Sequence, residues 1–301
     1  MTAHKVSRHS RKVWVGALCA MLAVTANVSP VFAAEKSSAK PASVSTDKQL
    51  MEYDVYAGGF HVVSSDLTVD LSKKNTYMLR LAAYTHGMLA KLAPWKGAFQ
   101  TDGWYNAKKD AGQPKLHFSD TVWRDERELT EFEYNKNGSF KEYRITNKKE
   151  KGAKPLEPGL ADDSTDVLTS TLHTMVKVAQ GGKCEGTDKI FDGSRSYNLV
   201  FKEVGKAMLE ATKLNVYSGP AIECTVEVKP LKGKWHEKPR GWMSIQEQGR
   251  ERGTMPTIWL AQMAPGEAAV PVKIRVKTDY GTLFMHLTGY KGAGKTLKLA
   301  Q

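Results

Sequence analysis

The sequence predicts a mainly β protein, in which an antiparallel sheet is accompanied by one amphipathic helix. Apolar and polar residues alternate in several short segments, such as 67–71 and 272–277, and this is the period of a strand with one buried face. Turn signals containing glycine separate these segments. Only one segment, 168–179, clearly shows the 3.6-residue period of a helix.

The strands are recognised by apolar residues at every second position. The clearest sets are Leu67, Val69 and Leu71; Phe132 and Tyr134; Cys224, Val226 and Val228; and Val272, Ile274 and Val276. Because most of the intervening residues are polar or charged, we expect each strand to bury one face and to leave the other in water, as antiparallel sheets do.

The strongest turn signal is Asn137-Gly138, which separates the strand segments 131–134 and 140–145. A type I′ turn needs positive φ at both central residues, and Asn-Gly tolerates this. The sequence therefore predicts a type I′ hairpin here. Further turn signals are Gly58-Gly59, Asp192-Gly193 and Tyr280-Gly281.

The predicted helix follows a loop, 147–159, that is rich in Lys, Gly and Pro. Its apolar stripe consists of Leu168, Leu172, Met175, Val176 and Ala179. Asp166 and the polar residues before it supply a cap and favourable charge at the start, and Gly181-Gly182 ends the helix. We expect it to cover an opening in the sheet. A shorter helical turn is expected over 86–92, before Pro94.

The beginning of the chain predicts export. Four basic residues lie between Lys5 and Lys12, the run Val13–Val28 is uncharged, and Val31-Phe32-Ala33 offers a cleavage site. The run is shorter than the roughly 20 residues that a membrane-spanning helix needs. We therefore expect a signal peptide over 1–33, cleavage after Ala33, a periplasmic location and no transmembrane anchor afterwards; the alternative is an uncleaved membrane helix.

The rest of the chain is expected to form one domain. We predict a disordered leader over 34–48, a single β domain over 49–290 and a flexible basic tail over 291–301. Without the four basic residues of 1–33, the chain has 40 basic and 32 acidic residues, a net charge of +8. This balance favours anionic partners, which outside the cytoplasm are lipid headgroups or cell-wall polymers and not nucleic acid.

Two cysteines remain after the expected cleavage, Cys184 and Cys224. In an oxidising compartment such a pair predicts a disulfide, which would close a loop of about 40 residues and contribute roughly 4 kcal/mol in the chain-entropy model. Two unpaired buried thiols are the alternative. A metal site is disfavoured because no second cysteine or regularly spaced histidine accompanies either residue.

No motif predicts catalysis or a cofactor. Residues 289–296 match the P-loop pattern, but the chain continues for only five residues after it, which leaves no room for the phosphate-binding helix. We therefore expect no nucleotide binding. The mature histidines lack the i, i+4 spacing of a helical zinc site, and no Gly-x-Ser-x-Gly elbow occurs.

One stretch mixes basic and aromatic residues in a way that suits anionic surfaces. Its members are Lys229, Lys232, Lys234, Trp235, Lys238, Arg240 and Trp242. Tryptophan rings with nearby cations occur at membrane interfaces and against sugars, so these residues are a candidate contact with an anionic surface. The alternative is an ordinary turn whose tryptophans pack inward.

The chain resembles an exported Gram-negative family catalogued as domain of unknown function family 3108. The resemblance covers most of 52–290 and rests on the order and spacing of several elements. These are Tyr53-Asp54-Val55-Tyr56 before Gly58-Gly59; Asp166-Val167-Leu168-Thr169; Cys184 and Gly186 before Ile190–Tyr197; Gly219-Pro220-Ala221 before Cys224; and Val270-Pro271-Val272 before Thr278–Gly281. The tail after Tyr290 departs from the pattern.

The resemblance implies a curved antiparallel sheet, a half-barrel or β-spiral similar to periplasmic lipoprotein carriers, wrapped around the helix. It implies no catalytic residues. A strongly bent sheet has an inner face too wide for its side chains to fill. We therefore expect a non-enzymatic envelope protein that binds an amphipathic, lipid-like ligand or a polypeptide in this concavity, unless the helix fills it. The alternatives are a cell-wall glycan or peptide hydrolase and a scaffold in an envelope complex that contacts lipid or peptidoglycan.

Overall fold

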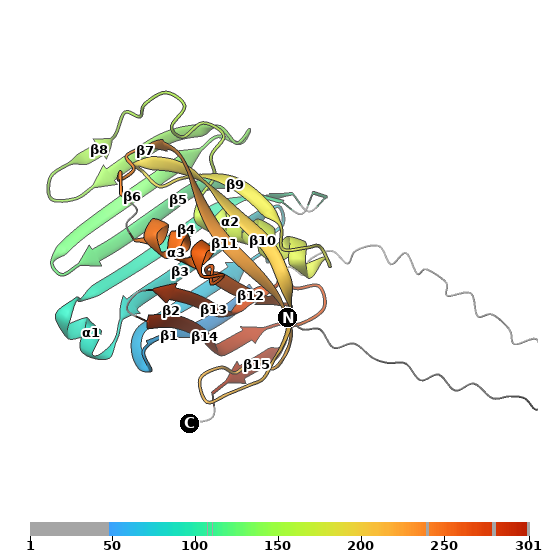
Figure 1. Cartoon of the computed structure of the whole chain (residues 1–301). Helices are drawn as coiled ribbons and strands as arrows, with labels where there is room; N and C mark the ends of the chain where they lie inside the picture. The colour runs from blue at the N-terminus through green and yellow to red at the C-terminus, as the bar shows by residue number, and fades with distance from the viewer. Residues whose placement is uncertain (1–47, 107, 110, 239–240, 279–280, 300–301) are drawn as a thin grey trace, which may run out of the picture. The chain divides into compact units, whose positions relative to one another are not determined.

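The computed structural model describes residues 48–106, 108–109, 111–238, 241–278 and 281–299 (Figure 1). The expected signal peptide, nearly all of the expected leader, and Arg240 lie outside these residues.

The described residues form one antiparallel sheet of fifteen strands. The first eight, which we call the first meander, are β1 (Lys48–Ala57), β2 (Phe60–Asp70), β3 (Thr76–Thr85), β4 (Trp95–Asn106), β5 (Ala111–Trp123), β6 (Glu126–Tyr134), β7 (Phe140–Thr146) and β8 (Lys151–Ala153). The second meander comprises β9 (Gly186–Phe191), β10 (Arg195–Leu209), β11 (Gly219–Gly233), β12 (Thr257–Ala261), β13 (Val270–Thr278) and β14 (Gly281–Gly292), and β15 (Lys295–Lys298) pairs with β14.

The two meanders join through the pairing of β1 with β14, so that the strand order runs from β8 through β1 and β14 to β9. In the described part of the chain, β8 and β9 are the two edge strands of the sheet. They do not pair with each other, so the sheet is not closed. The predicted alternation is visible in β1, where Gln49, Met51 and Tyr53 are buried between exposed neighbours. The predicted fold class, a curved antiparallel half-barrel, is confirmed.

Two of the turn signals illustrate different hairpins. Gly58 and Gly59 both have positive φ and form a two-residue connection between β1 and β2. At Asn137-Gly138 the type I′ prediction is wrong, because only Gly138 has positive φ. The amide of Gly138 donates to the carbonyl of Asn135, and Asn135 donates to Ser139. This is a three-residue loop with a glycine bulge.

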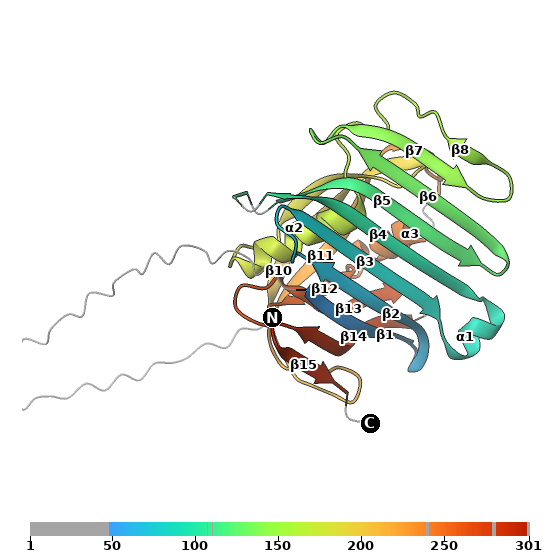
Figure 2. The same ribbon diagram turned by 180° about the vertical axis from the view of Figure 1, so that it is seen from behind.

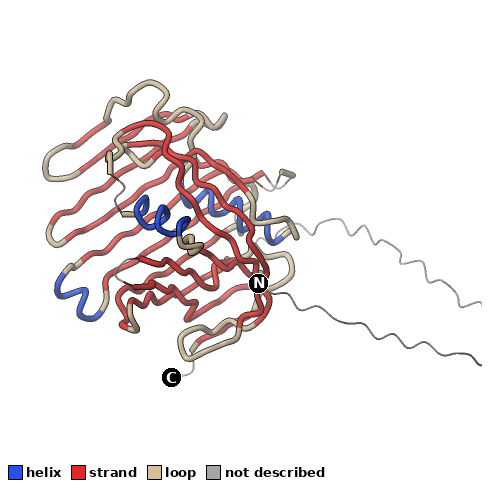
Figure 3. The backbone as a smooth tube through the Cα atoms, in the orientation of Figure 1, coloured by secondary structure: helices blue, strands red, loops and turns tan. Residues whose placement is uncertain are grey.

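Three helices accompany the sheet in the described residues: α1 (Gly87–Leu92), α2 (Val167–Ala179) and α3 (Trp242–Glu251) (Figure 3). The first two were predicted, and α3 was not. None of them is long and apolar enough to cross a membrane.

Helix α2 packs inside the curve of the sheet. It contacts β3, β4 and β5 of the first meander and β9, β10 and β12 of the second. Strands β10 and β11 cross in front of α2 in Figure 1, and β3 and β4 cross in front of it in the reverse view of Figure 2. Leu172, Met175 and Val176 of the predicted stripe are fully buried in the main core. The helix therefore joins the inner faces of both meanders.

Aromatic side chains fill the space between the two ends of the sheet. Phe132 and Tyr143 of the first meander pack with Phe191 of β9, with ring centroids 5.3 and 5.9 Å from that of Phe191. Leu160 and Ala161, from the connection between β8 and α2, complete this second core. These contacts close the curve through side chains and a loop instead of a strand ladder.

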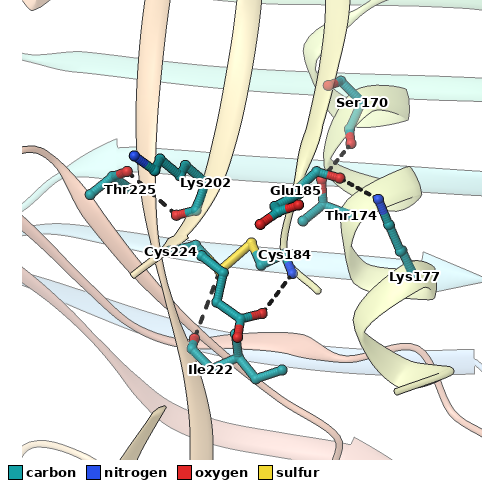
Figure 4. The surroundings of a disulfide bond; sticks show 10 residues. Ser170, Thr174, Lys177, Cys184, Glu185, Lys202, Ile222, Cys224 and Thr225 are labelled. Carbon is teal, nitrogen blue, oxygen red and sulfur yellow. Dashed lines mark hydrogen bonds between the residues drawn. A yellow bond between two sulfur atoms is a disulfide. The ribbon is translucent and has the colours of Figure 1, made fainter. Parts of the chain in front are cut away.

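The predicted disulfide between Cys184 and Cys224 is present (Figure 4). It links the segment that follows α2 to β11. The backbone amide of Cys184 also donates to the carboxylate of Glu203 on β10. Lys177 of α2 donates to the carbonyl of Glu185 next to the disulfide, as Figure 4 also shows. The end of the helix is thereby fixed to the second meander.

The prediction of a flexible tail over 291–301 is wrong for its described part. Strand β14 continues to Gly292, and β15 pairs with it from Lys295 to Lys298. Tyr290 at the end of the predicted domain is buried. The P-loop-like residues 289–296 therefore form a hairpin of two strands, and no phosphate-binding helix follows among the described residues.

Candidate functional site

An apolar cavity of about 370 Å³ lies inside the curve, against the second meander. We call it the α2–α3 cavity. Its lining consists of Val167, Thr171, Arg195, Tyr197, Leu199, Phe201, Val226, Val228, Trp235, Trp242, Met243, Pro256, Thr257, Ile258 and Ile274. A larger depression of about 430 Å³ on the opposite face of β5–β8 is lined by charged side chains such as Glu131 and Arg144. The α2–α3 cavity is therefore the better site for an apolar ligand.

One wall of this cavity exists because β12 is short. Strand β12 is five residues long and pairs with β11 only as far as Thr225. Beyond that point Gln246 of α3 takes the place of a strand. Its side-chain Oε1 accepts from the amide of Val228 at 2.8 Å, and its Nε2 donates to the carbonyl of Val228 at 2.6 Å. This contact holds α3 beside the cavity, where Trp242 and Met243 line it.

The opposite wall is the first turn of α2. The carboxylate of Asp166 accepts from the amides of Leu168 and Thr169 and fixes the start of the helix at Val167. Val167 is 42 % exposed although it is apolar, and it faces the cavity from this position. The residue that caps the helix therefore also places a partly exposed apolar side chain, Val167, against the cavity.

Basic and aromatic side chains gather at the margin of the cavity. The Arg195 guanidinium lies 4.5 Å from the centroid of Trp235, and Tyr197 meets the same ring edge-on. Arg195 also pairs with Asp192 at 2.7 Å. Burial, and secondly the charge of Asp192, raise the pKa of Tyr197 to about 12, so its hydroxyl remains protonated at neutral pH. The margin thus offers a cation and hydrogen-bond donors.

The structure divides the predicted basic and aromatic stretch between two roles. Trp235 and Trp242 both line the α2–α3 cavity, and Trp242 is also 37 % exposed. Lys232, Lys234 and Lys238 are exposed, and the exposed Lys229 lies 3.8 Å from Glu227. Val226 and Val228 of the lining were predicted only as an ordinary alternating strand, and the lining residues of β10 were not predicted, because alternation does not distinguish a filled interior from a hollow one.

A second cavity of about 310 Å³ lies against the first meander. Its lining is Leu81, Phe99, His117, Ser119, Thr130, Phe132, Asp166, Val167, Leu168, Ile190, Phe191 and Asp192. Val167 lines both cavities. The first turn of α2 therefore stands between two apolar spaces on the concave face.

A buried polar cluster borders the second cavity. The Asp166 carboxylate accepts from Thr101 at 2.7 Å and lies 3.3 Å from His117 Nδ1. Burial alone would raise the pKa of Asp166, but the charge and hydrogen bond of His117, and then the hydroxyls of Thr169 and Thr101, lower the pKa to about 2. The carboxylate is therefore ionised at neutral pH.

The geometry of this cluster favours a capping role. Thr101 Oγ1 lies 2.8 Å from His117 Nδ1, the same ring nitrogen that faces Asp166. In a catalytic triad the acid and the nucleophile contact opposite ring nitrogens. Among the described residues no group of three or more His, Cys, Asp or Glu side chains is arranged to hold a metal ion. The cluster fixes the start of α2 and adds polar groups to the lining of the second cavity.

Three comparisons place the chain among known proteins. No curated protein matches it. A solved structure described as a beta-barrel-like protein of domain of unknown function DUF1849 from Brucella abortus is 9 % identical, with a TM-score of 0.45 over 83 % of this chain and 99 % of that chain. The model of the family described as protein of unknown function (DUF3108) matches residues 52–288. The chain therefore belongs to the DUF3108 family.

Proposed function

We propose that this protein is a non-enzymatic binding protein of the bacterial envelope, located in the periplasm, which holds an amphipathic, lipid-like ligand in the α2–α3 cavity. The observation that carries the proposal is the apolar lining of this cavity, contributed by β10–β13, α2 and α3. Its volume of about 370 Å³ lies within the range of pockets that enclose small ligands. Removing an acyl chain from water here would provide the driving force.

The margin of the cavity selects the kind of ligand. Arg195 and Tyr197 add a cation and a hydroxyl to the apolar lining, and the exposed Lys232 and Lys234 lie close in sequence to Trp235 of that lining. An anionic headgroup would find partners there while its chain lies inside. The buried disulfide supports an oxidising compartment, which is consistent with the periplasmic location that the beginning of the sequence predicts.

The proposal is tested with a fluorescent fatty-acid probe and the variant Val167→Glu. A carboxylate at the first residue of a helix is favourable, so the fold should persist. The same carboxylate lines both cavities, where a bound acyl chain would have to desolvate it, and Arg195 in the lining is already paired with Asp192. The substitution should therefore weaken probe binding by on the order of tenfold or more. The measurement is the probe's dissociation constant, with melting temperature as the check on folding.

Val204→Glu is the matched control. Val204 is 52 % exposed on β10 and does not line either cavity, so the same substitution there should leave the dissociation constant unchanged. A wild-type protein that takes up no probe, or equal effects of the two variants, would contradict the proposal. Release of soluble fragments from purified cell walls would instead favour the hydrolase alternative.

A further inference from the structure

The first meander carries a cluster of protruding apolar side chains at one end, away from both cavities. Phe60, Met88, Leu92 and Trp123 are 70, 67, 70 and 48 % exposed. Among the described large apolar residues, only Met208 is more exposed than Phe60 and Leu92. We call these four residues, together with Lys91 and Lys96, the tip surface.

The residues of the tip surface come from three connections at the same end of the first meander, which backbone hydrogen bonds join. Phe60 begins β2, Met88 and Leu92 belong to α1, and Trp123 ends β5. The backbone amide of His86 donates to the carbonyl of Val62 at 2.7 Å, which joins α1 to the β1–β2 hairpin. The amide of Arg124 donates to the carbonyl of Pro94 at 2.9 Å, which joins the β5–β6 turn to the residues after α1. In Figures 1 and 2, α1 projects at the edge of the sheet.

Helix α1 does not contribute to the core of the protein. None of its six residues is buried, and neither Met88 nor Leu92 belongs to either hydrophobic core. The residues 84–96 contain Lys91 and Lys96 and no acidic residue, and both lysines are exposed. Lys96 lies near Asp120 of β5, whose pKa is lowered first by the hydrogen bond from Arg127 and also by the charge of Lys96. Asp120 itself pairs with Arg127 at 2.6 Å, and the β5–β6 turn places Arg124 next to Asp125 and Glu126 in the sequence.

We infer that the tip surface docks on an anionic lipid membrane. Its apolar side chains stand on separate turns instead of lining a groove, which suits insertion among lipid chains better than the capture of a peptide. Lysines next to apolar and aromatic side chains are the composition of interfacial membrane anchors. Their charge complements anionic headgroups. The inference is independent of the cavity, since docking needs no ligand inside the protein.

The test measures binding of the whole protein to sedimented vesicles of phosphatidylglycerol and phosphatidylcholine. Phe60→Ser with Leu92→Ser should lower the partition coefficient by about tenfold or more, because two exposed apolar side chains no longer reach the lipid. The matched control is Val204→Ser with Met208→Ser, which removes two exposed apolar side chains, 52 and 73 % exposed, from β10. Every variant carries the same residues 1–47, so any binding through that segment cancels in the comparison.

The charge contribution is tested separately. Lys91→Ala with Lys96→Ala should lower binding to anionic vesicles by about tenfold and should reduce the loss of binding caused by added salt. Lys202→Ala with Lys206→Ala removes the same charge from exposed positions on β10 and should have little effect.

Three outcomes would overturn the inference. The first is a wild-type protein that does not bind vesicles, and the second is equal losses in the tip variants and their controls. The third is a tip surface that mediates self-association in solution, seen as a dimer that dissociates when Phe60 and Leu92 are replaced. Sedimentation velocity without lipid distinguishes that result from membrane docking.

Discussion

The two meanders are built from the same kind of strand but differ in regularity. In the first, neighbouring strands from β1 to β6 pair along most of their length and are joined mainly by short turns. In the second, β12 has only five residues and covers only part of β11, α3 lies beside the uncovered part, and a disulfide ties β11 to the segment after α2. The regular half provides the scaffold, and the interrupted half provides the main cavity. The α2–α3 cavity lies where the pairing of β11 with β12 ends.

The largest expected effect tests whether the second meander depends on its covalent link. Replacing both Cys184 and Cys224 with Ala should lower the free energy of unfolding by about 4 kcal/mol, because the unfolded chain is no longer cross-linked across about 40 residues. Urea unfolding measures this change. Oxidised and reduced wild-type samples should differ in the same direction, and coinciding unfolding curves would show that the disulfide does not stabilise the fold.

The next effect concerns the helix that both meanders share. The pKa of Asp166 is lowered from 3.8 to about 2 in the folded protein, so its contribution is present above pH 4 and is lost as the pH falls toward 2. We expect about 2 kcal/mol of stability from this carboxylate. Asp166→Asn should remove that amount at neutral pH and flatten the stability profile between pH 4 and 2. An unchanged acid profile in the variant would contradict this assignment.

The smallest expected effect is tested with two glutamines, Gln246 of α3, which contacts the second meander, and Gln113 of the first meander. Gln246→Ala leaves the backbone amide and carbonyl of Val228 without their partner and should cost about 1–2 kcal/mol. Gln113 in the first meander also donates its amide to backbone carbonyls, but at an exposed turn, so Gln113→Ala should cost less than about 0.5 kcal/mol. Equal losses in urea unfolding would remove the distinction between the two halves.

Local patterns predicted most of the architecture. Alternation identified segments of β2, β6, β11 and β13, the stripe from Leu168 to Ala179 and its acidic cap identified α2, and the paired cysteines identified the disulfide. The resemblance to the family supplied the curvature. The strands and α2 can be predicted because their patterns lie in residues close together in the sequence. The disulfide can be predicted because only two cysteines remain to pair.

The parts that were missed depend on contacts between distant residues. Helix α3 buries only Gln246 and Gly249, so it has no apolar stripe to recognise, and its capping position is Gly241 with no side-chain hydrogen bond. The partners of Asp166 in its buried cluster, Thr101 and His117, come from β4 and β5. Nothing near Asp166 in the sequence indicates them.

The pairing of β1 with β14 also sets the order in which the fold can be completed. Leu50 pairs with Lys291. The first strand therefore cannot form this pairing until roughly 240 further residues have been synthesised. At about 5–20 residues per second of synthesis, this interval is on the order of 10–50 s. During that time β1 presents one open row of amides and carbonyls to other chains. A nascent copy of this protein is therefore exposed to aggregation until its final strands have been made.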